Sequence, residues 1–591
     1  MKLPSPACFA ISLGFAGLLA AATHAQIPER ITPAQTKEEA ILYTPAGFTK
    51  VGEPRWGGTV RGVIDGRAGH LELIVRDADT NQPLPCRVNV VARDGNFYHP
   101  PPHRLQYLSQ VSTWSHTSNH GGNRIGKAPY RYLGRFFYTL GETRLLVPDG
   151  AARIELWRGY EYRPETIDVQ IPAGGVKRVE AKLTRVAPMA SAGYYAGDTH
   201  LHTVRLTDED ERFFFDMLDV EDVSYGVNMT CNWVPTPLYR GQMDALLYPQ
   251  RAIGRPSIAT RGTRHVISGQ EYRTLHYGHL NISLRDDLVE PKRAPFATDT
   301  WPVHGVVARE TIDRGGFAYM AHGGYDQEIY ADAALGNTSG IELLQFAIYR
   351  QIGLENWYHI LNSGWRFSAH GASDYPGARF LSDCRTYVHH ATAPTMEQWL
   401  AGMAAGRSFF TTGPLLLLEV DGQKPGSQIQ KSGAGSHSVR ARVRMRCEVT
   451  PVTHLDLIVN GAVVKQLSIP AAESKGRWIE LEHPLALTQS SWIAARAHSK
   501  SPGGEPDAEA HTNPVFVYLN NRAPFRRESI DAWIAKVDVQ SAFHAKREFA
   551  EQARVLAYFQ GARDFLVRVR DQGGLRADDE PVKLAAKLAP R

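Results

Sequence analysis

The stretch Tyr194-Tyr195-Ala196-Gly197-Asp198-Thr199-His200-Leu201-His202 predicts a short strand that ends in polar residues. Because side chains alternate along a strand, Asp198, His200 and His202 are expected to point to the same side. Two imidazoles and a carboxylate at one strand end form part of a metal site, since neutral histidine and carboxylate suit zinc and similar ions. A polar strand end whose histidines only form hydrogen bonds is the alternative.

Further histidine and acidic residues downstream favour the metal site over this alternative. Glu271 ends an apolar run, His279 begins the next, His322 ends a third, and Asp374 follows a fourth. One histidine at a strand end is usually structural, but a series of such positions within one segment indicates a shared centre. The candidate metal ligands are His200, His202, Glu271, His279, His322 and Asp374.

The length and composition of the chain limit its class. Its 591 residues exceed a single hydrophobic core, so several domains are expected. Hydrophobic residues make up 43% and charged residues 21%, which is ordinary for a globular protein. The formal net charge of +5 is spread along the sequence without a long basic run, so no nucleic-acid partner is expected.

The first residues have the pattern of a secretory signal peptide. Lys2 precedes an apolar run at residues 9–22, and Thr23-His24-Ala25 before Gln26 offers a cleavage site. An N-terminal membrane anchor is the alternative, although this run is short for a span. No other stretch reaches about 18 uninterrupted apolar residues. The mature protein is therefore expected to be periplasmic or secreted, with no membrane contact after signal removal.

Hydrophobic periodicity divides the chain into segments. Apolar residues alternate with polar ones near Leu71 and again near Val439, which indicates β-sandwiches. Between them, short apolar strands alternate with helical stretches, which is typical of a parallel sheet or barrel. The predicted segments are a signal peptide (1–25), an extended lead-in (26–65), an N-terminal β-sandwich with an irregular insertion at 99–134 (66–190), an α/β metal-dependent hydrolase domain (191–414), a C-terminal β-sandwich (415–520), a helical segment (521–575) and a flexible tail (576–591).

The order of these motifs resembles the PHP superfamily, named for polymerase and histidinol phosphatase domains, and more closely its branch of secreted carbaryl (carbamate ester) hydrolases. The resemblance implies a multidomain α/β plus β protein: a distorted (β/α)7 PHP-type barrel flanked by two β-sandwich domains, with a C-terminal helical segment. It covers residues 193–420 and depends on Gly-Asp-x-His-x-His at 197–202, Gly-Gln-Glu at 269–271, Gly-His-Leu-Asn at 278–281, Ala-His at 321–322 and Ser-Asp at 373–374, with weaker matches at 384–388 and 406–414.

The same resemblance implies one to three divalent ions, but two family ligands are replaced here. Thr230-Cys231-Asn232 stands where the family has Thr-Asp-His, and Pro376 stands where the last strand has its histidine. We therefore expect one tightly bound ion, or two, rather than three, with zinc ahead of manganese or iron. By resemblance, His200 and His202 hold the first ion, Glu271 bridges, His279 and His322 hold neighbouring ions, and Asp374 closes the first site.

These features predict a secreted metal-dependent hydrolase that cleaves an ester, carbamate or phosphoester bond of a small molecule with metal-activated water. Asp374 or Asp198 is the candidate to orient or deprotonate that water, and Arg205 is a candidate for the substrate pocket. Two alternatives stay open: a phosphatase or phosphodiesterase of PHP type, and a non-catalytic extracellular binding protein on a degenerate barrel. The sequence does not indicate an oligomeric state.

The signal-peptide pattern predicts export with cleavage near Ala25, because the small residues before Gln26 follow a short apolar run. N-terminal sequencing of protein from the periplasm or medium should begin at or near Gln26. An intact Met1 species recovered from the cytoplasm would contradict the signal-peptide interpretation.

Overall fold

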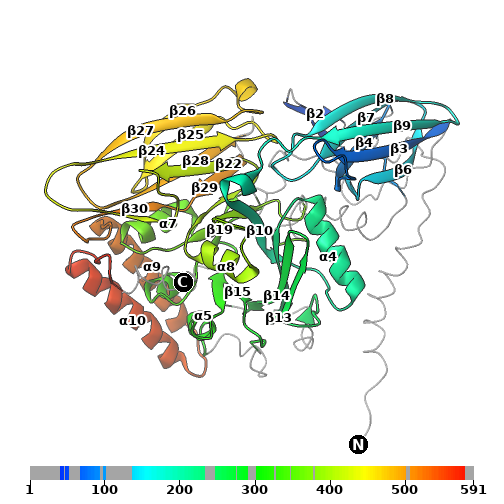
Figure 1. The fold of residues 1–591 in the computed structure, drawn as a ribbon. Coiled ribbons are helices and arrows are strands. Elements are labelled where there is room, and N and C mark those ends of the chain that lie inside the picture. The colour runs from blue at the N-terminus through cyan, green and yellow to red at the C-terminus, as the bar shows by residue number, and fades with distance from the viewer. Residues whose placement is uncertain are drawn as a thin grey trace, which may run out of the picture. The chain divides into compact units, whose positions relative to one another are not determined.

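The computed structural model describes residues 40–44, 47–51, 67–93, 98–100, 136–232, 246–274, 276–289, 301–324, 328–346, 348–376, 380–500 and 506–579. The predicted signal peptide, most of the lead-in, residues 101–134 of the insertion and residues 580–591 of the tail lie outside them. The chain forms two compact units (Figure 1). The first takes the described residues up to Val186 together with Asp219–Glu221, and the second takes residues 187–218 and Asp222 onward.

The first unit contains two small sheets that share one hydrophobic core. One sheet has the order β6-β3-β9 and the other the order β5-β4-β7-β8. Leu71, Leu73 and Val75 from alternate positions of β3 meet Val88 and Val90 of β4 in this core. The strands are β1 (Ala40–Thr44) and β2 (Gly47–Val51), which pair with each other, and β3 (Ala68–Asp77), β4 (Cys86–Ala92), β5 (Phe137–Thr139), β6 (Glu142–Pro148), β7 (Gly150–Trp157), β8 (Glu165–Ile171) and β9 (Val176–Leu183).

The second unit is organised by a network of eighteen paired strands. β10 (Tyr194–Leu201) pairs in parallel with β11 (Tyr225–Asn232), which pairs in parallel with β14 (Arg264–Arg273). Because parallel strands end at the same edge of a sheet, His200 of β10 and Glu271 of β14 come to one edge. The other elements of residues 191–414 are β12 (Leu246–Leu247), β13 (Gly254–Arg261), β15 (His279–Ser283), β16 (Phe317–Met320), β17 (Ile341–Gln345), β18 (Ile348–Tyr349), β19 (Ala369–Gly371), β20 (Arg385–His389), β21 (Ser408–Thr411), α4 (Asp208–Val220), α5 (His304–Asp313), α6 (Ile329–Ala334), α7 (Gly353–Asn362) and α8 (Met396–Ala404).

The prediction of a distorted (β/α)7 barrel is wrong. Strands make up 42% of the structure and helices 22%, and β13, β14, β15 and β16 pair antiparallel in succession. A (β/α) barrel instead needs parallel neighbours, each joined to the next by a helix. No helix separates β13 from β14, or β14 from β15, in the described part of the chain. The prediction failed because short apolar runs between polar stretches look alike in hairpins and in βα units.

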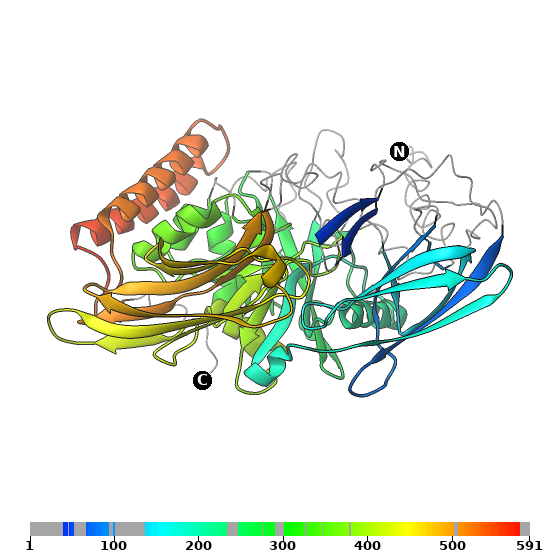
Figure 2. The same cartoon turned by 90° about the horizontal axis from the view of Figure 1, so that it is seen from above.

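The chain after Pro414 adds further strands and a pair of helices. β22, β24 and β27 form an antiparallel sheet, in which Arg442 and Arg444 lie within 2.9–3.0 Å of Glu480. α9 and α10 pack side by side (Figure 2), and the Trp533 ring of α9 meets Trp365 at 4.7 Å. The elements are β22 (Leu415–Val420), β23 (Gln428–Lys431), β24 (His437–Arg446), β25 (His454–Val459), β26 (Ala462–Ser468), β27 (Ile479–Leu487), β28 (Ser491–Lys500), β29 (Pro506–Thr512), β30 (Val515–Leu519), α9 (Arg527–Ala545) and α10 (Gln552–Asp571).

Trp399 of α8 fixes the strand that carries the first histidines. α8 starts with a capping box, in which Thr395 and Gln398 bond each other's backbone amides. The Trp399 ring stacks on Tyr225 at 5.2 Å, and its Nε1 donates to the carbonyl of Tyr195 at 2.9 Å. A Cβ on Gly197 would lie 2.3 Å from this ring, so the glycine of the opening motif lets β10 approach the tryptophan.

Among the described residues, no helix is both long and apolar enough to cross a membrane. Helices α9 and α10 have the length, but both carry charged residues along their whole course.

Replacing Trp399 should destabilise the second unit. Trp399→Ala removes a fully buried ring and leaves a cavity, so we expect a loss of about 3–5 kcal/mol of unfolding free energy. Val539→Ala is the control, because Val539 on α9 is 66% exposed and its loss should cost less than about 0.5 kcal/mol. Urea unfolding followed by circular dichroism compares them, and equal midpoints would refute the packing role.

Candidate metal centre

His200 and His202 at the end of β10 present matching nitrogens. The Nδ1 of His200 lies 2.7 Å from a carboxylate oxygen of Glu342, and the Nδ1 of His202 lies 2.9 Å from the carbonyl oxygen of Met229. The Asn281 amide nitrogen also lies 3.1 Å from the Nδ1 of His200. With an oxygen acceptor beside each Nδ1, a neutral ring would carry its proton on Nδ1. The Nε2 lone pair of both histidines is thereby left for a ligand, as in metal-binding histidines.

The two Nε2 atoms face a pair of carboxylates. Both nitrogens are buried and have no hydrogen-bond partner among the described residues. The Nε2 of His202 lies 3.3 Å from Glu271 and 3.2 Å from Asp374, and the Nε2 of His200 lies 3.5 Å from each. Ligands at 2.0–2.1 Å from a tetrahedral ion lie about 3.3 Å from one another. These four side chains, the inner group, therefore have the spacing of donors around one ion.

A second set of donors, the outer group, shares Glu271. The Nδ1 of His279 lies 2.6 Å from Glu271 Oε1 and 2.9 Å from the Nε2 of His322, which is 3.1 Å from the same carboxylate oxygen. These distances are in the hydrogen-bonding range, shorter than the edge of a coordination shell. The outer group is therefore closed by direct contacts, and its donors must separate slightly to admit an ion.

The hairpin of β14 and β15 explains the contact between Glu271 and His279. Glu271 pairs with Asn281 across the hairpin, and Arg273 pairs with His279. Diagonal neighbours on one face of an antiparallel pair are within reach of long side chains. The bend at Gly278 (φ +93°) and the short loop between the strands thus bring a carboxylate and an imidazole, eight residues apart, to one point.

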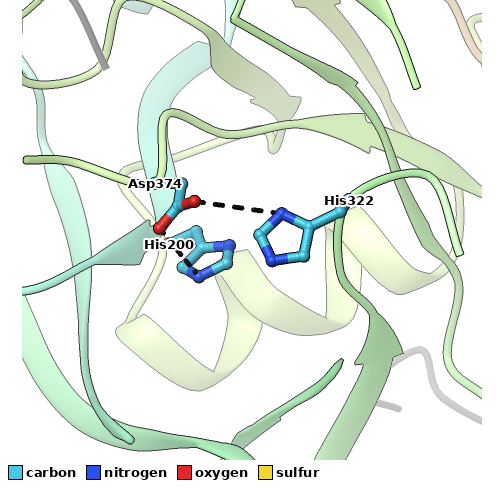
Figure 3. A group of neighbouring side chains, drawn as sticks. All are labelled: His200, His322 and Asp374. Atoms are coloured by element: carbon cyan, nitrogen blue, oxygen red, sulfur yellow. Dashed lines mark ion pairs between the residues drawn. The ribbon is translucent and has the colours of Figure 1, made fainter. Parts of the chain in front are cut away.

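His322 and Asp374 both have left-handed backbones, with φ of 57° and 55°. Such values are uncommon outside glycine and occur where the surroundings determine the conformation. After His322, Gly323 donates its amide to the carbonyl of Glu342, and a Cβ there would lie 2.4 Å from a backbone oxygen of Arg350. The chain turns sharply after β16 and directs His322 toward Asp374 (Figure 3).

Three overlapping groups of donors could hold a metal ion, each with ligand atoms within 4.8 Å of one another. The structure thus brings all six predicted ligands into one cluster. The groups are His200, His202 and Glu271; His200, His322 and Asp374; and Glu271, His279 and His322.

Supporting residues that the sequence reading missed surround the ligands. Glu342 of β17 holds His200, Gln345 of β17 lies 2.9 Å from the Nδ1 of His322, and Arg273 bonds Glu271 through two nitrogens at 2.5–2.7 Å. A register shift in β17 between Glu342 and Leu344 lets residues 342 and 345 serve the same face. In the sequence, this supporting role could have been inferred from Glu342, an acidic residue within the otherwise apolar start of Ile341–Gln345.

Asp198 and Arg205 occupy supporting positions. Asp198 is fully buried and accepts bonds from the amide of His200 and from the amide and hydroxyl of Ser373, so it ties β10 to the segment that carries Asp374. Burial raises the pKa of Asp198 to about 7. Arg205 donates to Glu211 and Ser268, and these contacts give no support to its predicted role in the substrate pocket.

The electrostatics of the cluster favour a cation. Burial opposes ionisation of Glu271, but Arg273, His279 and His200 hold the pKa of this carboxyl well below its ordinary value. Burial also opposes the charge of Asp374, but its neighbouring histidines hold its pKa below the usual range. Burial lowers the pKa of His279 to about 4, although the neighbouring carboxylate of Glu271 opposes this shift. Burial opposes protonation of His200 and His202, but Glu342, Asp374 and Glu271 raise the pKa of His200 well above its ordinary value, and Asp374 and Glu271 raise that of His202. The cluster therefore attracts positive charge, which a divalent ion would supply in place of these protons.

Solvent reaches the cluster on one side. The side chains of Asp374, His279 and Arg273 are 18–21% exposed, whereas those of His200 and Glu271 have no exposed surface. Tyr248 is half-buried, and its ring lies 5.0 Å from that of His202. Burial raises the pKa of Tyr248 to about 12, and the charges of Asp374 and Glu271 contribute to this rise. The buried ligands thus have an accessible face on the side of Asp374.

Comparisons with known proteins supply no family. No family model matches the chain, and no curated protein matches it. A streptococcal ancillary pilin is 16% identical over 28% of this chain and 47% of that chain, with a TM-score of 0.13. A structure described as pT26-6p is 8% identical over 31% of this chain and 50% of that chain, with a TM-score of 0.16. The chain covers about half of each, and the resemblance to the PHP superfamily stays a prediction.

Removal of one inner ligand should remove the metal. His200→Ala deletes an Nε2 donor of the inner group, and we expect metal content after dialysis to fall below a tenth of the original. Glu342→Gln keeps the shape of the side chain but replaces the carboxylate that contacts the Nδ1 of His200, and should weaken metal affinity about 10- to 100-fold. His390→Ala is the control, because His390 bonds the carbonyl of Thr392 outside the cluster. Elemental analysis that finds full metal in folded His200→Ala protein would refute the inner group.

Proposed function

We propose that this chain is a metal-dependent hydrolase that acts on an ester, carbamate or phosphoester bond of a small molecule. The supporting observation is the inner group: two buried histidine nitrogens without hydrogen-bond partners among the described residues face two ionised carboxylates. These two nitrogens and two carboxylates converge on one point at 3.2–3.5 Å, which gives a single ion four donors there. Mixed nitrogen and oxygen donors suit zinc, with manganese or iron as alternatives.

The two groups of donors support one tight ion and a weaker second. The inner group already has the spacing of a coordination shell, whereas the outer group is closed by hydrogen bonds that an ion must displace. Glu271 belongs to both groups, so a second ion would share this carboxylate with the first. Cys231 contributes no donor to these groups, and burial raises the pKa of its thiol to about 12. An ion is therefore expected to occupy the inner group first.

We assign the remaining roles at the site to two aspartates, Asp374 and Asp198. A bound divalent ion lowers the pKa of water toward neutrality and polarises a carbonyl or phosphoryl oxygen. Asp374 is the candidate to orient water, because its Oδ1 faces His200 and His202 while its Oδ2 lies 3.9 Å from His322 and the side chain is 18% exposed. Asp198 is fully buried and bonded to Ser373, so we assign it the positioning of Asp374's segment instead.

Metal analysis joined to a substrate screen tests this function. Dialysed protein should retain one equivalent of metal, and a second only when metal is supplied in excess. Aryl esters, aryl carbamates and phosphoesters should be tested with the native protein, His200→Ala and His390→Ala. We expect hydrolysis of at least one class that disappears in His200→Ala and on chelation but persists in His390→Ala. Metal retention without hydrolysis of any class would instead favour a non-catalytic binding protein.

A further inference from the structure

Tyr248 has a backbone conformation that tyrosine rarely adopts. Its φ is 54°, in the left-handed region where a bulky side chain is strained. Strain of this kind persists only where the surrounding structure imposes it. The strained residue stands at the start of a segment, residues 248–251, that runs beside the loop following His202.

A hydrogen-bond network holds this segment in place. The side-chain amide of Gln250 donates to the carbonyls of Tyr248 and Thr203, and its oxygen accepts from Asn228 and Ser268. The backbone of Arg205 bonds that of residues 249 and 251. Asn228 lies on β11 and Ser268 on β14, so Tyr248 is anchored to the same strands that position the metal donors.

The Tyr248 side chain lies beside the accessible face of the cluster. Its ring lies 5.0 Å from that of His202 at an interplanar angle of 30°. Within the described ranges, the hydroxyl forms no hydrogen bond, and the side chain is half-buried. A polar group placed beside a metal-binding cluster without a partner is available to a ligand.

We propose that Tyr248 contacts the substrate: its ring forms a wall beside His202, and its hydroxyl donates a hydrogen bond to the substrate oxygen that gains negative charge. An ordinary phenol is protonated at neutral pH and therefore serves as a donor. A fixed donor aimed at a developing oxyanion stabilises the transition state more than the ground state. The rigid anchoring of residue 248 supplies the fixed position that this role needs. This inference depends on the proposed function for its catalytic part and on the cluster alone for its binding part.

Tyr248→Phe tests the hydroxyl, and Tyr195→Phe is the matched control. Tyr195 lies on β10, is also partly buried, and its hydroxyl forms no bond within the described part of the chain. With zinc-loaded protein and the substrate found in the screen, Tyr248→Phe should lower kcat about 100-fold with little change in KM. Calorimetric titration with inorganic phosphate should show about tenfold weaker binding. Metal content should be unchanged, and Tyr195→Phe should behave as the native protein in every measurement.

Tyr248→Asn provides a second variant that keeps the backbone, because asparagine tolerates the left-handed region. It removes the ring as well as the hydroxyl, so KM should rise in addition to the loss in kcat. Native protein that binds phosphate through Tyr248 but hydrolyses nothing would support the contact and reject the proposed function. Hydrolysis and phosphate binding that are equal in Tyr248→Phe, Tyr195→Phe and native protein would overturn the inference while the hydrolase function stands.

Discussion

The buried carboxylate of Glu271 is the interaction on which the centre of this molecule depends. It has no exposed surface, and burial of an unpaired charge is too costly for a folded protein to carry. Arg273 and His279 bond it directly, while His200, His202 and His322 approach it from β10 and from the turn after β16. The positions of these strand ends are thereby set by a shared electrostatic requirement as well as by packing.

The ligand positions could be predicted from the sequence because they depend on local rules. A histidine or acidic residue at the end of an apolar run lies at a strand end, and such ends meet where strands are parallel. The parallel pairing of β10, β11 and β14 brings His200, His202 and Glu271 to one edge, whereas His279 arrives through a hairpin and His322 and Asp374 follow left-handed turns. Although the predicted topology was wrong, the six candidate ligands lie in one cluster that could hold a metal ion: His200, His202, Glu271, His279, His322 and Asp374.

Prediction of the strand topology and of the supporting residues would have required knowledge of contacts between residues far apart in the sequence. Apolar periodicity does not show whether two successive strands run parallel or antiparallel, so it could not predict the hairpins β13–β14 and β14–β15. Glu342 contacts His200 and Gln345 contacts His322 from the same face of β17, which an irregular register in this strand makes possible. Tyr248 reaches His202 through a network that joins three separate stretches of chain. Arg205 follows the histidines closely, yet its partners were not visible in sequence, and it pairs with Glu211.

The bonds between Asp198 and Ser373 join positions 175 residues apart, next to the first and last ligands. An ion held by His200 and Asp374 would close the same long loop of chain, and closing a loop restricts the unfolded ensemble. A ligand that binds only the native state at 1,000 times its dissociation constant adds about 4 kcal/mol of stability. Metal binding would therefore stabilise the native state as well as supply chemistry, and a stabilised native state opens less often to proteases.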